Sequence, residues 1–467
     1  MATVANVLHT LTNYGPAVFL PIIMLALGLV LRMKFMAAAS AAILLGVAFA
    51  AVSLVIGYIL GVFGPVGQQM IHQTGLHLSA FDLGWTPAAA ISWAWRFAAL
   101  GFVIEIIVNI VMLWGKLTSI LNVDMWNVWH LSWMGALITM VTGSYLLALA
   151  WDIIWVIMQL KVGDAIRSRV QDLTGIPGVT STHPMFFNMI WLYPVYWVVN
   201  QIPGLDRVRI SPDSMREKLG IFGENHVLGF IIGCLIAIAG RESAAVVLET
   251  GIEAAAALTL FPLVSALFMR ALVPISEAAT EFMKARFPGR MFYVGLDWPI
   301  LAGISTIWTV SILTIPFVLI AALVLPGNLV LPFGSIMFIG GVVPAVMLTR
   351  GDMIKTWIMS VIMLPVYFYA ASWLAPLMTQ LATSTRVVTL PPHVQYITWL
   401  NQDTPGVTWF MAEVPHLFAD GQALVAIGAS LLAIVLVWLQ VRYWRRANAD
   451  RPEPTNPDVP LTGEAAG

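Results

Sequence analysis

The chain has 467 residues, of which 59% are hydrophobic and 10% charged, whereas a soluble domain carries about 25% charged residues. This composition indicates a protein whose surface faces lipid and excludes an ordinary soluble enzyme. The 23 basic and 24 acidic residues nearly cancel, so no strong net charge points to nucleic acid, and the single Cys234 excludes an internal disulfide.

Apolar stretches recur along the whole chain, with short polar or Pro/Gly-rich breaks between them. They cover 14–31, 38–63, 92–114, 131–160, 185–200, 227–240, 243–269, 299–325, 331–348, 353–376 and 423–441. A membrane-spanning helix needs about 20 residues, so we expect an all-α polytopic protein with about 11 spans. The stretches 185–200 and 227–240 are shorter than this, and we expect short or re-entrant helices there.

The basic residues predict an orientation in the membrane. They cluster just after the first and last apolar stretches, at Arg32, Lys34, Arg442, Arg445 and Arg446. Such clusters stay on the cytoplasmic side, so we expect the N-terminus outside and the C-terminus inside. Residues 1–445 then form one transmembrane domain, and the Pro- and Glu-rich 446–467 a disordered cytoplasmic tail.

The most informative segment is Asn122-Val123-Asp124-Met125-Trp126-Asn127-Val128-Trp129-His130, which lies between two apolar stretches. Polar groups at membrane depth are costly and are usually functional. Asp124, Asn127 and His130 are three residues apart, so a helix would present them on one face. Together they offer the donors and acceptors that a polyol or sugar needs, with Trp126 as an apolar pocket wall. The alternative is a helix cap formed by Asn122 or Asp124 beside an interfacial aromatic belt.

Further polar breaks precede later apolar stretches. In Gly220–His226, Glu224 and His226 can bind a ligand or form an ordinary capping loop. Asp297 can hold a hydroxyl or cap the helix that starts at Pro299. Asn328 in a Pro-Gly-Asn sequence reads mainly as a turn residue, and the break Asp82–Pro87, which contains Trp85, as a turn or a pocket wall.

Motifs for other chemistries do not occur in a suitable context. The sequence has no Walker-type phosphate loop, no paired metal-binding histidines and no Gly-x-Ser-x-Gly elbow. We therefore expect no metal and no cofactor, and a passage for a solute rather than an autonomous enzyme.

Several of these segments, in this order, resemble the galactitol-type enzyme IIC of the bacterial phosphotransferase system, a member of the ascorbate–galactitol superfamily. They are NVDMWNVWH at 122–130, FGE at 222–224, GLD at 295–297 and LPGNLVLPFG at 325–334. The resemblance runs from about residue 10 to about 440. It implies a homodimeric permease of the cytoplasmic (inner) membrane, in which a substrate-holding core moves against a dimerising scaffold in an elevator-like manner.

The resemblance also implies partners and site residues. A phosphorylated IIB protein, supplied by a IIA protein, would phosphorylate galactitol or a related polyol or sugar, so the chain is no enzyme by itself. Asp124, Asn127, His130, Glu224 and Asp297 are the implied substrate-binding residues, and Trp85, Trp126, His226 and Asn328 possible pocket walls. The alternative is an ion-coupled secondary transporter, in which Asp124, Glu224 or Asp297 carries a proton or sodium ion.

Overall fold

The computed structural model of the chain is mostly helical (77%). It describes residues 16–30, 32–74, 78–82, 84–93, 95, 97–98, 100–122, 124, 126–205, 225–286, 292–332, 335, 337–385 and 395–449. The tail expected at 446–467 lies largely outside these residues, and the last helix continues to Ala449.

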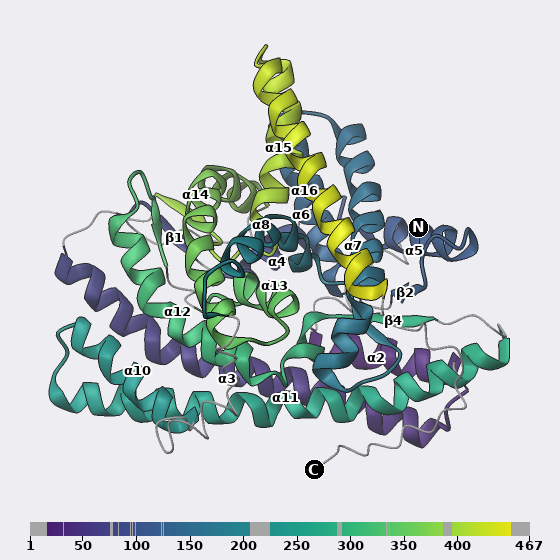
Figure 1. Cartoon of the computed structure of the whole chain (residues 1–467), viewed down its shortest axis with the longest axis horizontal. Coiled ribbons are helices and arrows are strands. Elements are labelled where there is room, and N and C mark those ends of the chain that lie inside the picture. The colour runs from purple at the N-terminus through teal and green to yellow at the C-terminus, as the bar shows by residue number, and fades with distance from the viewer. Residues whose placement is uncertain are drawn as a thin grey trace.

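Two very long helices and two shorter ones form one side of the molecule. They are α2 (Pro16–Val30), α3 (Phe35–Thr74), α10 (Asn225–Ala239) and α11 (Ala244–Arg286), and α3 and α11 run along each other in Figure 1. Glycines allow α10 to approach α11 closely: a Cβ atom at Gly233 would lie 2.5 Å from the carbonyl oxygen of Thr250. Small residues at such contacts let helix backbones pack without a hydrophobic driving force.

The remaining helices form a compact bundle above these. The first group is α4 (Trp85–Trp93), α5 (Leu100–Trp114), α6 (Trp129–Thr142), α7 (Tyr145–Thr174) and α8 (Met189–Val199). The second is α12 (Ser305–Val324), α13 (Ile339–Thr349), α14 (Met353–Thr385), α15 (Pro405–Ala419) and α16 (Ala423–Ala449). Short 3-10 turns η1 (Trp126–Val128), η2 (Pro184–Asn188) and η5 (Trp298–Leu301) precede α6, α8 and α12.

The all-helical expectation needs one addition, because the described residues also include six short strands. They are β1 (Ala80–Asp82), β2 (Ile120–Asn122), β3 (Val179–Ser181), β4 (Tyr293–Leu296), β5 (Val330–Leu331) and β6 (Tyr396–Thr398). They form two parallel sheets, in the orders β5-β1-β6 and β2-β4-β3. Runs of two to four residues carry too little period-2 pattern to be distinguished from helix in an apolar sequence.

The two sheets interleave the two halves of the chain. β1 pairs with two late strands, with Ala80 opposite both Val330 and Tyr396, whereas β4 pairs with two early ones, with Tyr293 opposite Ile120 and Val294 opposite Val179. Each sheet therefore takes its central strand from one half of the chain and its edge strands from the other.

Four of the described helices are long and apolar enough to cross a membrane: α7, α12, the 353–384 part of α14, and α16. Shorter apolar helices lie at 35–48, 103–114, 184–199 and 339–349. Only 17% of the apolar window of α16 is buried, against 67% for α12. The exposed apolar residues of α16 support a lipid-facing position, in line with the membrane protein that the composition predicts.

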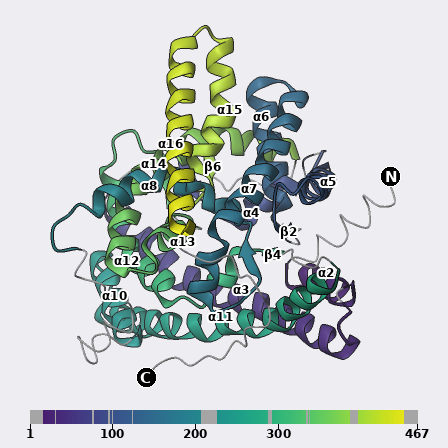
Figure 2. The ribbon, with the colours of Figure 1, turned by 45° about the vertical axis from the view of Figure 1, so that its right-hand side comes forward.

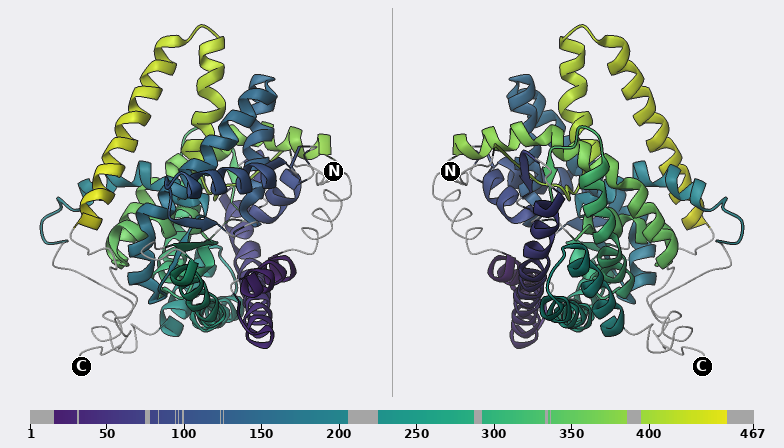
Figure 3. Two further views of the ribbon diagram at one scale, coloured as in Figure 1. Left: turned by 90° about the vertical axis from the view of Figure 1, so that its right-hand side faces the viewer. Right: turned by 90° about the vertical axis from the view of Figure 1, so that its left-hand side faces the viewer.

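Helices α15 and α16 form an antiparallel hairpin that projects from the bundle (Figure 2). From their joined tip the two helices diverge toward the rest of the molecule, as both views of Figure 3 show. α16 then packs along α8 and α7, so the hairpin is anchored at its open end.

Candidate functional site

Polar side chains converge at the carboxyl ends of β2, β4 and β3. Asn122 ends β2, Asp297 directly follows β4, and Thr182 and His183 follow β3. The carboxyl ends of parallel strands meet at one edge of a sheet, and for this reason residues far apart in sequence lie together here. The same edge of an open parallel sheet is where ligands bind in many α/β proteins.

The Asn127 amide joins two of the acidic residues. Its Nδ2 donates one hydrogen bond to Asp124 Oδ2 and another to Asp297 Oδ1, the second at 2.9 Å. An amide nitrogen has two hydrogens, so both are used. Asp124 Oδ1 also accepts the backbone N–H of Asn127 at 3.2 Å, and Asp297 Oδ1 accepts that of Trp298 at 2.6 Å.

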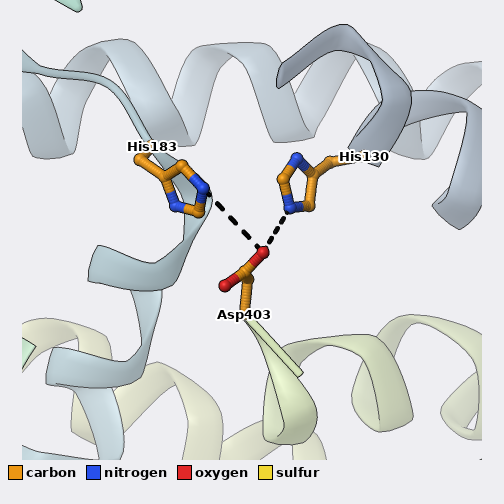
Figure 4. Close-up of side chains that lie close together, drawn as sticks. All are labelled: His130, His183 and Asp403. Carbon is orange, nitrogen blue, oxygen red and sulfur yellow. Dashed lines mark hydrogen bonds and ion pairs between the residues drawn. The ribbon is translucent and has the colours of Figure 1, made fainter. Parts of the chain in front are cut away.

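His130 contacts an acid from the far end of the chain. Its Nε2 lies 2.7 Å from Oδ2 of Asp403, which comes just before α15, and its ring stacks on Trp129 with the centroids 3.8 Å apart. His183 approaches the same oxygen, with 3.8 Å between its Nε2 and Asp403 Oδ2 (Figure 4). Both imidazoles are buried, so the three side chains form one enclosed cluster.

Counting protons shows that His130 and Asp403 share one. The other His130 nitrogen, Nδ1, faces the Asn127 carbonyl oxygen at 3.1 Å, and a carbonyl can only accept, so Nδ1 carries a hydrogen. The 2.7 Å contact between Nε2 and the carboxylate then needs a second hydrogen, either on the ring or on Asp403. In both forms the pair is neutral overall, and it can take up or release a proton at one short hydrogen bond.

His183 has the opposite arrangement. The backbone N–H of Met185 donates to its Nδ1 at 3.1 Å, which places the proton of the neutral ring on Nε2. That nitrogen points between Asp297 Oδ1 at 3.7 Å and Asp403 Oδ2 at 3.8 Å. Ligand atoms of His130, His183 and Asp403 lie within 4.8 Å of one another. Because His183 Nε2 carries a hydrogen and acts as a donor, it is poorly suited to bind a metal. The residues favour hydrogen bonding over metal binding.

Burial sets the electrostatics of this cluster. It raises the pKa of Asp297 well above the ordinary value for aspartate, and the charge of Asp124 raises it further. It also lowers the pKa of His183 well below the ordinary value for histidine, helped by His130. Burial raises the pKa of Asp403 too, with the bond to His130 opposing the rise. The cluster therefore holds protons on its acids more readily than on His183.

A second layer of hydrogen bonds, around Asn122, holds the polar cluster in place. Asn122 accepts from Thr182 Oγ1 at 2.7 Å and donates to Glu105 Oε1 at 2.6 Å, and Gln159 Nε2 donates to Glu105 Oε2 at 2.8 Å. These bonds connect β2 and β3 to α5 and α7. Side chains held by such a layer keep the geometry of the inner groups.

The loop before α15 is held similarly. Asn188 Nδ2 lies 2.8 Å from the Asp403 carbonyl oxygen and 2.7 Å from Tyr367 Oη. Next to Asp403, Gln402 is 1% exposed, and neither its Nε2 nor its Oε1 finds a partner among the described residues. A buried amide with unused donors and acceptors is a candidate for contact with a ligand.

The structure brings together four of the five predicted site residues: Asp124, Asn127, His130 and Asp297. The predicted helix through Asp124, Asn127 and His130 is wrong, because Asp124 precedes the 3-10 turn η1 and α6 begins only at Trp129. The three residues therefore lie on a turn and a helix start rather than on one helical face. Asp297 caps η5, as one of its two alternatives predicts, and it also accepts a hydrogen bond from Asn127. Its contact with a substrate hydroxyl stays a prediction.

The other predicted residues are placed elsewhere or not described. Glu224 lies outside the described residues, and of Trp126 only the backbone is described, in η1. His226 is exposed on α10, which packs on α11, α12 and α3. Asn328 bonds the backbone of Ala322 and Val330, as a turn residue does.

Sequence reasoning missed His183 and Asp403. Both share a signal with Asp297, a polar side chain one or two positions before a proline that opens a helix: His183-Pro184, Asp297-Trp298-Pro299 and Asp403-Thr404-Pro405. Pro is favoured in the first turn of a helix, so this pattern marks a polar residue at a helix N-terminus.

Comparisons with known proteins identify the family of the chain. A family model described as "PTS system sugar-specific permease component" matches residues 10–392. The PTS system galactitol-specific EIIC component of Escherichia coli (strain K12) is 31% identical over 446 residues, covering 94% of this chain and 97% of that protein. A putative permease IIC component of the same organism is 31% identical over 382 residues, covering 79% and 85%. The chain thus belongs to the family of sugar-specific permease components of the phosphotransferase system.

Proposed function

We propose that the chain imports galactitol or a related polyol and presents it to a separate phosphorylated IIB protein. The observation that carries this proposal is the cluster of Asn127, His130, His183, Asp297 and Asp403 at the edge of the β2-β4-β3 sheet. Several of its donors and acceptors are shared or held at distances beyond a direct hydrogen bond. The name of the galactitol-specific relative supports the substrate class.

The geometry suits hydroxyl groups. A hydroxyl both donates and accepts, and His183 Nε2–H faces two carboxyl oxygens that are 3.7 and 3.8 Å away. A polyol oxygen that accepts from Nε2 and donates to Asp297 or Asp403 would replace these long contacts with short ones. The unpaired amide of Gln402 supplies further donors and acceptors.

The pair formed by His130 and Asp403 fits phosphorylation of the bound substrate. A hydroxyl that attacks a phosphoryl group must lose its proton, and when both ring protons are on His130 the ionised Asp403 carboxylate can accept it. Phosphorylation by IIB would then trap the product inside. We place the site in a moving core and assign dimerisation to a scaffold, in a homodimer of the inner membrane with its C-terminus in the cytoplasm.

The test is uptake of labelled galactitol and other polyols by vesicles that contain the chain, with phosphoenolpyruvate and the soluble phosphotransferase proteins supplied or withheld. Phosphorylated product that depends on phosphoenolpyruvate supports the proposal. His130→Ala should weaken uptake without changing membrane insertion. Accumulation of unmodified polyol, driven only by an ion gradient, would refute the proposal.

A second candidate, ion-coupled transport, is favoured by two buried acids outside the cluster. Glu105 is 1% exposed and bonded to amides rather than to a cation in the described part of the chain. Asp152 on α7 is 5% exposed, and its Oδ1 has no hydrogen-bond partner among the described residues. Collapsing proton and sodium gradients in the same vesicles separates the two functions.

A further inference from the structure

A large hollow lies away from the polar cluster, beside the amino-terminal ends of β2 and β4. Its volume is about 870 Å³, and its walls come from α7, the C-terminal part of α16 and the turn between α5 and β2. Ser119 and Tyr293 form its inner end, and Val437 and Val441 part of its outer wall.

Its charged lining is mainly basic. Four basic side chains and one acidic side chain line the hollow, which gives a net charge of plus three: Lys116, Lys161, Arg167, Arg445 and Asp164. Lys116 and Arg445 are exposed, and Lys161 is 56% exposed. Such a set attracts an anion of more than one charge or several negative oxygens.

Asp164 lies 3.7 Å from Lys161 Nζ and 3.9 Å from Arg167 Nη1, so it offsets part of their charge. The exposed Lys116 and Arg445 carry the positive charge at the mouth of the hollow.

Asp164 accepts from Thr118 Oγ1 at 2.8 Å and from Ser119 Oγ at 2.6 Å. Ser119 in turn accepts from Arg167 Nη1 at 2.7 Å, and the Arg167 guanidinium lies over the Tyr293 ring at 4.9 Å. These contacts hold the inner wall in place.

The outer wall is also fixed. Asn448 near the end of α16 donates to the Ala165 carbonyl at 3.0 Å and accepts from Ser168 Oγ at 2.8 Å, which clips α16 to α7. The hollow is therefore built by contacts from three separate parts of the chain.

An apolar groove continues from the basic hollow. A second hollow of about 560 Å³ lies between α15 and α16, lined by Phe410, Ala433, Ile434 and Trp438 among others. It shares Val437, Val441 and Arg445 with the first. Its lining residues belong to the two helices that diverge from the hairpin tip in Figure 3. The basic hollow and the apolar groove thus meet along one stripe of α16, a helix of membrane-spanning length.

We propose that this composite hollow binds an anionic phospholipid, with the phosphate headgroup among Lys116, Arg167 and Arg445 and an acyl chain in the groove between α15 and α16. Basic pockets between membrane helices, at their cytoplasmic ends, bind such headgroups. The arginines at the end of α16 fit that location under the positive-inside rule. The apolar groove selects a lipid over a soluble anion or an acidic protein loop, since neither fills it.

The test uses the purified full-length chain in detergent. The chain is titrated separately with phosphatidylglycerol, with phosphatidylcholine of the same acyl chains, and with glycerol phosphate. Native mass spectrometry counts the bound molecules, and the melting temperature of the chain is recorded. We expect phosphatidylglycerol to bind and raise the melting temperature, and the other two to do so much less. Equal effects of the two lipids would overturn the proposal. Equal binding of glycerol phosphate would show a site for soluble phosphates instead.

Paired variants locate the site. Lys116→Asn with Arg445→Gln should weaken phosphatidylglycerol binding about tenfold or more, because each basic residue near a membrane surface contributes substantially. Asparagine tolerates the positive φ of 56° at position 116. Arg446→Gln changes the same charge on the same helix end but does not line the hollow, and it should have little effect.

A second pair tests the acyl groove. Ala433→Trp fills the space between α15 and α16 and should displace the lipid, whereas Leu432→Trp introduces the same side chain at a position 53% exposed that lines neither hollow. If both tryptophan variants bind phosphatidylglycerol like the original chain, the groove is not the acyl site. If Arg446→Gln loses as much binding as the double variant, the headgroup is not held in the hollow.

Discussion

The two parallel sheets have related topologies but opposite uses of their acidic residues. At the end of β1 in one sheet, Asp82 accepts hydrogen bonds from Gly84 N at 3.1 Å, Ser335 N at 2.7 Å, Ser335 Oγ at 2.9 Å and Leu400 N at 2.9 Å. At the end of β4 in the other, Asp297 shares the donor Asn127 Nδ2 with Asp124 and lies 3.7 Å from His183 Nε2.

The difference separates a structural carboxylate, Asp82, which we call the brace, from the carboxylates of the candidate site. The Asp82 carboxylate accepts three backbone N–H groups and one serine hydroxyl, so it has little left to offer a ligand, and it ties three chain segments together. The acids around His183 are crowded, and their contacts with its Nε2, at 3.7 and 3.8 Å, are too long for direct hydrogen bonds. Such crowding of titratable groups is common at functional sites. Burial alone does not distinguish the two, since both aspartates are enclosed by the bundle.

The largest effect is expected when the brace is removed. Asp82→Ala leaves buried N–H groups of Ser335 and Leu400 without an acceptor, at about 1–3 kcal/mol each. We expect the free energy of unfolding to fall by about 3 kcal/mol or more and the yield of folded protein to drop sharply, as measured by thermal unfolding in detergent. Asp420→Ala, at a half-exposed position, is the control. Equal melting temperatures for the two variants would refute the brace.

Asp403→Asn tests whether the acids near His183 act in function rather than in stability. The amide can still donate to His130 Nε2, so the fold should survive with a nearly unchanged melting temperature, but the shared proton is lost. We expect phosphoenolpyruvate-dependent phosphorylation of the polyol to fall about 100-fold. Asp420→Asn serves as the matched control. Activity within threefold of the original chain would remove Asp403 from the mechanism.

A smaller effect is expected from the pH dependence of Asp297. Its raised pKa means that the carboxyl group keeps its proton to a higher pH than an ordinary aspartate. While protonated it can accept from one polyol hydroxyl through one oxygen and donate to another through the other, and it stops donating once the pH passes the raised value. Polyol binding should therefore weaken about tenfold as the pH rises through that range. Asp297→Asn, which donates at every pH, should flatten the profile measured by equilibrium binding. An unchanged profile in this variant would assign the titration to another group.

The smallest effect is expected at Asn328, which the sequence offered as a pocket wall. Its bonds to Ala322 O and Val330 O are local to a turn, so Asn328→Ala should cost about 1 kcal/mol of stability and leave uptake within twofold. A loss of uptake comparable with that of Asp403→Asn would place the turn in the site after all.

The sequence predicts the membrane class and part of the cluster for a physical reason. Asp124, Asn127 and His130 are conspicuous because polar groups are rare beside long apolar stretches. Their meeting with His183 and Asp403 depends on pairing between strands of two to four residues, for which the local pattern is too short. Asp82, in a similar break, reads the same as Asp297 in the sequence, because the number of donors around a carboxylate is a property of the fold.

The interleaving of the strands has a consequence for how the protein is made. β1 emerges early in synthesis, yet its partner β6 follows more than three hundred residues later, with Tyr396 opposite Ala80. The first half of the chain therefore enters the bilayer with a central strand that has no neighbour on either side. Completion of that sheet must wait until the ribosome has almost finished, and a chain truncated before β6 cannot assemble it.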